Sequence, residues 1–157
     1  MRSNARTHLC VALVLLGFGA SLRSDPADGA RAGMRKAGRH WATKVASHGG
    51  YVWEYSTDFV TRRRGESEDL PLSTVWVQAG TPMVGEAFLG AYRATGEALY
   101  LDAAVAAAEC LAYGQLESGG WTYSIEFNPK LAKHRYHHLV GEKTKGYNTT
   151  KIGRAHV

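Results

Sequence analysis

The hydrophobic positions of the chain follow two kinds of pattern, and the helical kind appears first. In residues 26–47 apolar side chains recur at intervals of three and four, the period of an amphipathic helix. They are Ala30, Met34, Ala37, Trp41 and Val45. Asp25 followed by Pro26 is a typical helix start, with a capping carboxylate before proline in the first helical position. The glycine pair at 49 and 50 ends the pattern, so we expect a helix from Pro26 to about Ser47.

A second helical pattern predicts a hairpin in residues 81–113. The first helix begins at Thr81 and ends at Gly96, and the second runs from about Ala98 to Tyr113. The first helix has an apolar face made of Val84, Phe88, Ala91 and Tyr92. The stripe that we expect the second helix to bury consists of Leu101, Val105, Ala108, Leu111 and Ala112.

The second kind of pattern alternates with a period of two, as extended strands do. Tyr51, Trp53 and Tyr55 alternate in this way, and residues 74–77 form a short run of β-branched and aromatic side chains. The charged segment between them, residues 62–69, has the composition of a solvated loop. These segments are too short to predict a substantial sheet.

A glycine pair followed by aromatic residues occurs twice, as GGYVWEYS at 49–56 and as GGWTYSIE at 119–126. Each copy follows a helical pattern, so the chain reads as a repeat of helices and GG-aromatic loops. Helical repeats need neighbours to bury their apolar faces. We therefore predict a mainly α fold, an incomplete α/α toroid of helical hairpin repeats with little or no sheet.

The two ends differ from the rest of the chain. Residues 1–21 combine a positive start with a short apolar run and small residues, which is the pattern of a secretory signal peptide. Residues 151–157, KIGRAHV, match a peptide encoded by a common sequencing-library adapter, and the alternative is an ordinary polar tail. We expect residues 22–150 to be the N-terminal part of one domain. The expected location is secreted or periplasmic, with no membrane contact after signal cleavage.

Removing both ends changes the charge argument. The chain has 19 Lys and Arg against 14 Asp and Glu, a formal net charge of +5. Four of these cations lie in the expected signal and tail, namely Arg2, Arg6, Lys151 and Arg154. The remainder has a net charge of +1, which does not support nucleic-acid binding.

Cysteine and histidine positions give no metal motif. Cys10 belongs to the expected signal, which leaves Cys110 unpaired in an apolar helical pattern, as a small buried residue. The spacing of His134, His137 and His138 is not that of a zinc site. We therefore assign no metal ligand.

Aromatic residues are the candidates for substrate binding. They are Trp53, Tyr55, Trp76, Trp121 and Tyr123. Flat aromatic faces stack on sugar rings, and phenol or indole hydrogens bind hydroxyl groups. The alternative is that these side chains pack between helices. For the two GG-aromatic loops together, we expect at least one to line a substrate.

Charged side chains supply weaker candidates. Arg62, Arg63 and Arg64 could meet an anionic ligand, because guanidinium groups fit carboxylates, or they could be solvated beside acidic neighbours. The carboxylates available as acid, base or calcium ligand are Glu54, Asp58, Glu117 and Glu126. None of these lies in a specific motif.

Several segments in this order resemble the pectic acid lyases of polysaccharide lyase family 10, over about residues 34–150. The segments are HGGYVWEYSTD (48–58), TVWVQ (74–78), Gly-Thr-Pro (80–82), AYRATG (91–96), YLDAA (100–104), GQLESGGWTYSIEF (114–127) and NTT (148–150). The resemblance implies an α/α-barrel-like fold and cleavage of pectate, or polygalacturonate, by β-elimination. It also implies calcium as cofactor of a full-length protein.

In that family an arginine is the base and acidic residues hold calcium, mainly beyond the segments matched here. The resemblance therefore places no catalytic residue or calcium ligand in this chain, and we expect the chain alone to be inactive. Two alternatives remain, a glycoside hydrolase on an α/α toroid, with a carboxylate pair, and a non-catalytic carbohydrate-binding protein.

Overall fold

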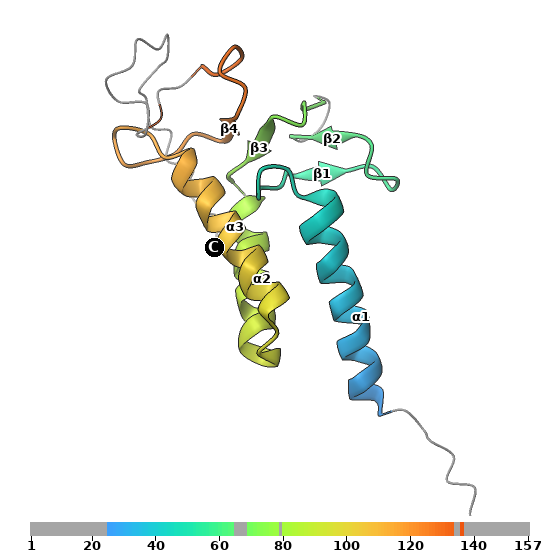
Figure 1. Ribbon diagram of the computed structural model, residues 1–157. Coiled ribbons are helices and arrows are strands. Elements are labelled where there is room, and N and C mark those ends of the chain that lie inside the picture. Colours follow the sequence, from blue (N-terminus) through green and yellow to red (C-terminus); the bar gives the residue numbers. More distant parts are fainter. Residues whose placement is uncertain (1–24, 65–68, 79, 134–135, 137–157) are drawn as a thin grey trace, which may run out of the picture.

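The computed structural model describes residues 25–64, 69–78, 80–133 and 136. The helices of the described residues extend from one end of the molecule, where the short strands and the loops gather (Figure 1). Helices α2 and α3 lie side by side, and α1 stands next to them. No helix in the described ranges is long and apolar enough to cross a membrane.

Helix α1, Pro26–His40, continues into a π-helical turn η1, Trp41–Val45. Asp25 caps it as predicted, since its carboxylate accepts a hydrogen bond of 3.0 Å from the Ala27 N–H. Near the other end, the Thr43 hydroxyl donates to the Arg39 carbonyl at 2.8 Å. The helix predicted over this part of the chain is confirmed, with its last turn wound more loosely.

The predicted helical hairpin is also confirmed, as α2, Thr81–Thr95, and α3, Ala98–Tyr113. Gly96 joins them with a φ of 72°, a conformation that favours glycine. The stripe predicted for the second helix is wrong. The residues of α3 that are buried are Tyr100, Ala103, Ala107 and Cys110, whereas Val105 is 46% exposed.

Small side chains explain why the buried face of α3 differs from the predicted stripe. A Cβ atom added to Gly85 of α2 would lie 3.1 Å from the Cβ of Ala107, so the two helices approach closely at this point. Val105 is exposed instead, whereas the ring of Tyr100 packs in this contact, 6.4 Å from that of Phe88. The spacing of apolar residues therefore selected the wrong stripe, because close packing favoured alanine over valine at this contact.

Within the described residues, four short strands form two antiparallel pairs at the end of the helices. Strand β1, Glu54–Tyr55, pairs with β2, Arg62–Arg63. Strand β3, Thr74–Trp76, pairs with β4, Ser124–Glu126, in a register that places Val75 opposite Ile125. Both of these central side chains are fully buried.

The predicted incomplete α/α toroid is therefore wrong, and so is the expectation of little or no sheet. The described chain is a small α+β fold of three helices and two small antiparallel sheets. The two GG-aromatic loops do not mark equivalent helical repeats. The first leads into the β1–β2 pair, and the second supplies β4 to a partner strand that precedes the hairpin.

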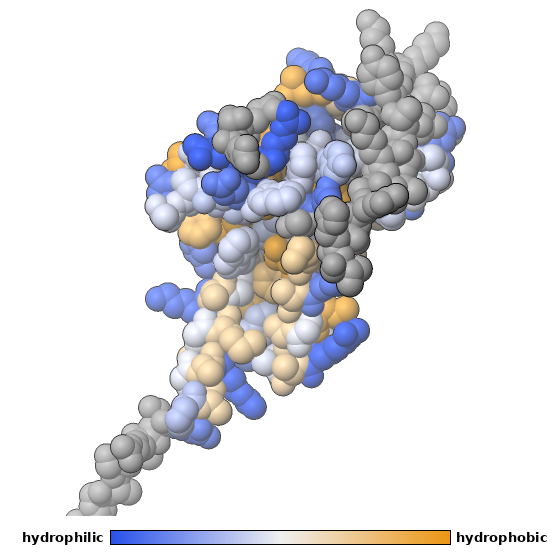
Figure 2. All heavy atoms as spheres, turned by 180° about the vertical axis from the view of Figure 1, so that it is seen from behind, coloured by the Kyte–Doolittle hydropathy of each residue, from blue (hydrophilic) through white to orange (hydrophobic). Residues whose placement is uncertain are grey.

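Two apolar clusters hold the elements together. One joins α1 to the hairpin around Tyr51, Phe88 and Tyr100, and the other joins α3 to the β3–β4 sheet around Val75, Cys110 and Ile125. An open apolar groove of about 460 Å³ remains beside the first cluster, with Met34 and Met83 at its exposed margin. Figure 2 shows weakly apolar residues along this helical part of the molecule.

Candidate functional site

Strand β3 and the residue after it form backbone hydrogen bonds with both GG-aromatic loops. The Trp76 N–H donates to the Tyr51 carbonyl of the first loop at 2.7 Å. The next N–H along the chain, that of Val77, donates to the Tyr123 carbonyl of the second loop, also at 2.7 Å. Backbone hydrogen bonds thus place both aromatic segments against one short strand.

Two of the five predicted binding residues stack on each other. The rings of Trp76 and Tyr123 are 5.8 Å apart and 11° from parallel. Trp76 is 8% exposed and Tyr123 is 38% exposed, so the indole supports a phenol that reaches solvent. The indole Nε1 of Trp76 has no hydrogen-bond partner within the described residues. This pair is an aromatic platform, built by the β3–β4 register.

The first loop divides its aromatics between surface and interior. Trp53 is 53% exposed and makes no ring contact within the described residues. Tyr55 is half-buried, its ring meets Trp41 edge-on at 5.7 Å, and its hydroxyl accepts a hydrogen bond of 2.9 Å from the Val52 N–H. Burial raises the pKa of the Tyr55 hydroxyl. Trp53 is thus available to a ligand, whereas Tyr55 mainly packs against α1 and η1.

Trp121 has a structural role in the second loop. Its indole N–H donates to the Leu111 carbonyl at 2.7 Å and so joins the loop to the end of α3. Its ring packs against the cluster around Val75 and Ile125. The contacts of Trp121 therefore hold in place the loop that carries Tyr123.

A second aromatic stack was not predicted from the sequence. Phe127 lies between His48 and Tyr113, with centroid distances of 4.2 Å and 4.3 Å and nearly parallel rings. A pocket of about 290 Å³ opens beside them, with Glu109 also in its wall. The three rings come from distant parts of the sequence, and the only local signal was His48 in front of the glycine pair.

The carboxylates in the described ranges do not form a calcium site. Glu126 accepts hydrogen bonds from the Thr74 hydroxyl at 2.5 Å and from the Asn128 N–H at 2.7 Å. Asp58 accepts from Ser56 Oγ at 2.6 Å and from the Val60 N–H, and the first of these bonds is the main cause of its lowered pKa. Calcium takes six to eight oxygen ligands. No group of three or more potential metal ligands occurs among the described residues.

The arginine run has a structural role at its first position. Arg62 is buried and donates to the carbonyls of Pro71 and Thr74 at 2.7 Å and 3.1 Å, which fixes the segment that enters β3. Burial lowers the pKa of its guanidinium. Arg63 pairs with Asp69 at 3.1 Å. Of the two alternatives for these arginines, pairing with an acidic neighbour describes Arg63, whereas Arg62 is buried rather than solvated.

The remaining candidates from the sequence are a cysteine and a group of histidines. Cys110 is free and buried as expected, and burial raises the pKa of its thiol to about 12, which keeps it protonated at neutral pH. His134, His137 and His138 lie outside the described residues.

Comparison with known proteins gives no relative for this chain. No family model, no curated protein and no solved structure matches it. The site must therefore be interpreted from its own chemistry.

Proposed function

We propose that this chain binds polygalacturonate and is part of a secreted polysaccharide lyase that cleaves pectate by β-elimination. The ordered segments that resemble pectic acid lyases support the reaction class. The observation that carries the binding proposal is the stack of Trp76 under Tyr123, with the phenol ring reaching solvent.

The platform suits a sugar ring for two physical reasons. A pyranose has patches of C–H groups that pack on an aromatic face, and the near-parallel support of Trp76 holds the Tyr123 ring in one orientation. The supporting strand is in turn fixed by Val75 opposite Ile125 in the core. A ring held in advance loses little conformational freedom when a ligand binds.

The part that we assign to the described residues is recognition of the polymer. In β-elimination a base removes the proton at C5 of a uronide, while the negative charge that develops at the carboxylate is stabilised. We assign no calcium ligand and no base among the described residues. The calcium requirement remains a prediction for a longer lyase.

A non-catalytic carbohydrate-binding protein is the second candidate. It is favoured by the hydrogen bonds of Glu126, whose two carboxylate oxygens accept from Thr74 and Asn128 and serve the sheet and the following turn. A carboxylate engaged in this way stabilises the loop that carries the platform. Binding without turnover would be the signature of this candidate.

Binding of oligogalacturonates to the chain, followed by calorimetry, tests the platform. Tyr123→Ala removes the stacking ring and is expected to weaken binding by about 1 kcal/mol, roughly fivefold. Tyr123→Phe is the matched control, since it keeps the ring and is expected to bind within about twofold of the unaltered chain. Equal affinity for the alanine variant would remove the platform from the proposal.

Incubation with polygalacturonate separates the reaction classes. A lyase releases unsaturated uronides, seen as new ultraviolet absorbance that requires calcium and disappears with a chelator. Reducing sugars without new absorbance would point to hydrolysis instead. Binding with neither product supports the non-catalytic candidate.

A further inference from the structure

The outer face of α1 carries a series of cations that the proposed aromatic platform does not use. Residues 29–44 contain five Lys and Arg residues, one His and no Asp or Glu. Lys36, His40 and Lys44 follow one another at intervals of four, and Arg35 and Arg39 form a second row beside them. At 1.5 Å per residue, the first row extends over about 12 Å of the helix.

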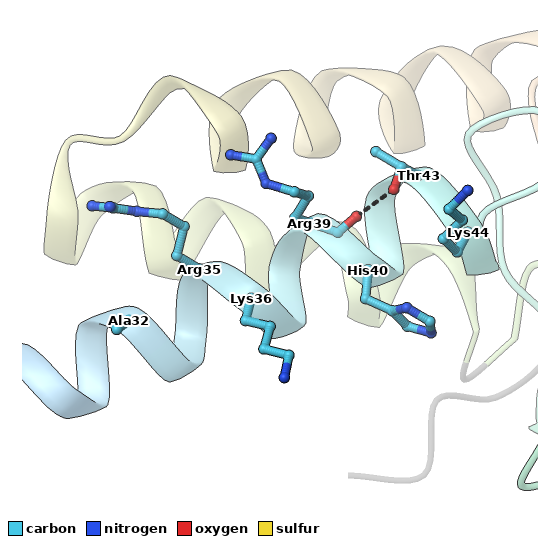
Figure 3. A pocket seen from close by; sticks show the side chains of 7 residues that line it. All are labelled: Ala32, Arg35, Lys36, Arg39, His40, Thr43 and Lys44. Atoms are coloured by element: carbon cyan, nitrogen blue, oxygen red, sulfur yellow. Dashed lines mark hydrogen bonds between the residues drawn. The ribbon is translucent and has the colours of Figure 1, made fainter.

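These side chains surround a shallow pocket of about 470 Å³. Figure 3 shows Arg35 and Arg39 directed to one side of α1 and Lys36 and His40 to the other. The other residues that line the pocket are Ala32, Thr43 and Lys44. The result is an open basic surface with room for a ligand between two rows of donors.

Most of this charge is not neutralised within the described residues. Arg35 forms two hydrogen bonds of 2.8 Å with Glu97, which fix its guanidinium and raise its pKa. Lys36, Arg39 and Lys44 are exposed, and no carboxylate in the described ranges pairs with them. These three cations therefore remain available to an external anion.

The close spacing of these cations lowers the stability of α1 when no ligand is bound. Like charges three or four residues apart on one helix repel each other, and Arg39 lies at these intervals from Lys36 and Arg35. A ligand with regularly spaced negative charges would convert the repulsion into attraction. Charge patterns that lower local stability are expected at surfaces that bind a ligand.

We infer that the basic face of α1 binds a linear polycarboxylate, one chain of polygalacturonate, along the helix axis. Guanidinium and ammonium groups are the usual partners of carboxylates, and a series of them fits a polymer better than a single small anion. Single-stranded nucleic acid is less suitable, because its sites interleave cations with exposed aromatic rings and the lining of this pocket has only His40. The identity of the polymer rests on the proposed function.

The test compares two variants of the full chain that lose the same three charges. Lys36→Gln/Arg39→Gln/Lys44→Gln neutralises the α1 face, and Arg93→Gln/Lys130→Gln/Lys133→Gln is the matched control at exposed positions elsewhere. Calorimetry measures binding of oligogalacturonates and of their fully methyl-esterified forms, at low salt and at about 0.15 M ionic strength.

We expect the α1 variant to bind oligogalacturonates about tenfold more weakly at low salt, with a smaller difference at the higher ionic strength. The control variant should bind within about threefold of the unaltered chain. Methyl-esterified oligomers should bind the α1 variant and the unaltered chain with equal affinity. The melting temperature of the α1 variant should be equal or higher, because the repulsion of Arg39 by Lys36 and Arg35 has been removed.

Other results overturn the inference and identify what has failed. If both triple variants bind oligogalacturonates equally while Tyr123→Ala still weakens binding, the α1 site is wrong and the proposed function stands. If the unaltered chain binds no oligogalacturonate, the proposed function fails. Binding of double-stranded DNA or of anionic vesicles through α1 in that case would replace the polyuronate with another polyanion.

Discussion

The first and second GG-aromatic loops, residues 49–56 and 119–126, have similar sequences and use them differently. In both loops the second residue after the glycines is buried, as Val52 and as Thr122, and the third is exposed, as Trp53 and as Tyr123. The residue directly after the glycines is buried Tyr51 in one loop and half-buried Trp121 in the other. The burial of the second position and the exposure of the third are shared, whereas the surroundings are not.

The glycines differ most between the two loops. A Cβ added to Gly49 would lie 2.3 Å from the Ala106 carbonyl oxygen, and one added to Gly50 would lie 2.7 Å from Cys110 Sγ. A Cβ on Gly119 would have no atom within 4 Å. The first pair thus allows the chain to touch α3, while Gly119 serves a turn with a φ of 85°. Equal sequence patterns therefore do not establish equal structural roles.

The largest expected effect comes from adding a methyl group at these glycines. Gly49→Ala combines a positive φ of 76° with a backbone clash, so we expect it to lower the free energy of unfolding by about 3 kcal/mol or more. Gly119→Ala has only the unfavourable φ and should lower it by about 1 kcal/mol. Urea unfolding monitored by circular dichroism measures both. Equal losses would contradict the difference drawn between the two loops.

A smaller effect is expected from the indole that anchors the second loop. Trp121→Phe removes the hydrogen bond to the Leu111 carbonyl and should destabilise the fold by about 1–2 kcal/mol. The matched control in the first loop is Trp53→Phe, which changes an exposed ring and should alter stability by less than about 0.5 kcal/mol. Thermal unfolding of the two variants ranks them. A larger loss for Trp53→Phe would reverse the assignment of anchor and surface residue.

The last effect is expected for Tyr51, and it is confined to alkaline pH. Burial raises its pKa to about 12, above the value of about 10 in an unfolded chain. The folded state therefore keeps a proton that the unfolded state loses. The resulting stabilisation is complete below about pH 10 and is lost as the pH rises to about 12.

Tyr51→Phe should therefore reduce the loss of stability between about pH 10 and pH 12. It should not abolish that loss, because burial also raises the pKa of Tyr136 and of Cys110 to about 12. Unfolding in urea at several alkaline pH values gives the slope. An unchanged slope would show that Tyr51 does not titrate as a buried group.

The helices could be predicted from the sequence because their signals are local. Asp25 before Pro26, the three-and-four spacing and Gly96 each act within a few residues, and each was confirmed. The sheet could not be predicted in this way. Thr74 and Glu126 are 52 positions apart, and neither short strand shows which partner it will find.

The candidate site was predicted in part. Sequence reasoning selected Trp76 and Tyr123 as aromatic candidates, but their stacking depends on the β3–β4 register. Attention to consecutive arginines selected Arg62, which is buried and bonded to carbonyl oxygens. The cations of α1 are spread over residues 31–44 and form rows only on a helix, so a helical projection of this segment would have revealed them.

The position of the hairpin in the chain has a consequence for the order of folding. Strand β3 ends just before α2 begins, and β4 follows the end of α3. Closing a long flexible loop is slow and entropically unfavourable, whereas an α-hairpin forms through contacts between near neighbours. Once α2 and α3 pair, they bring the two strand segments together. The aromatic platform should thus appear late in refolding, as a product of the hairpin.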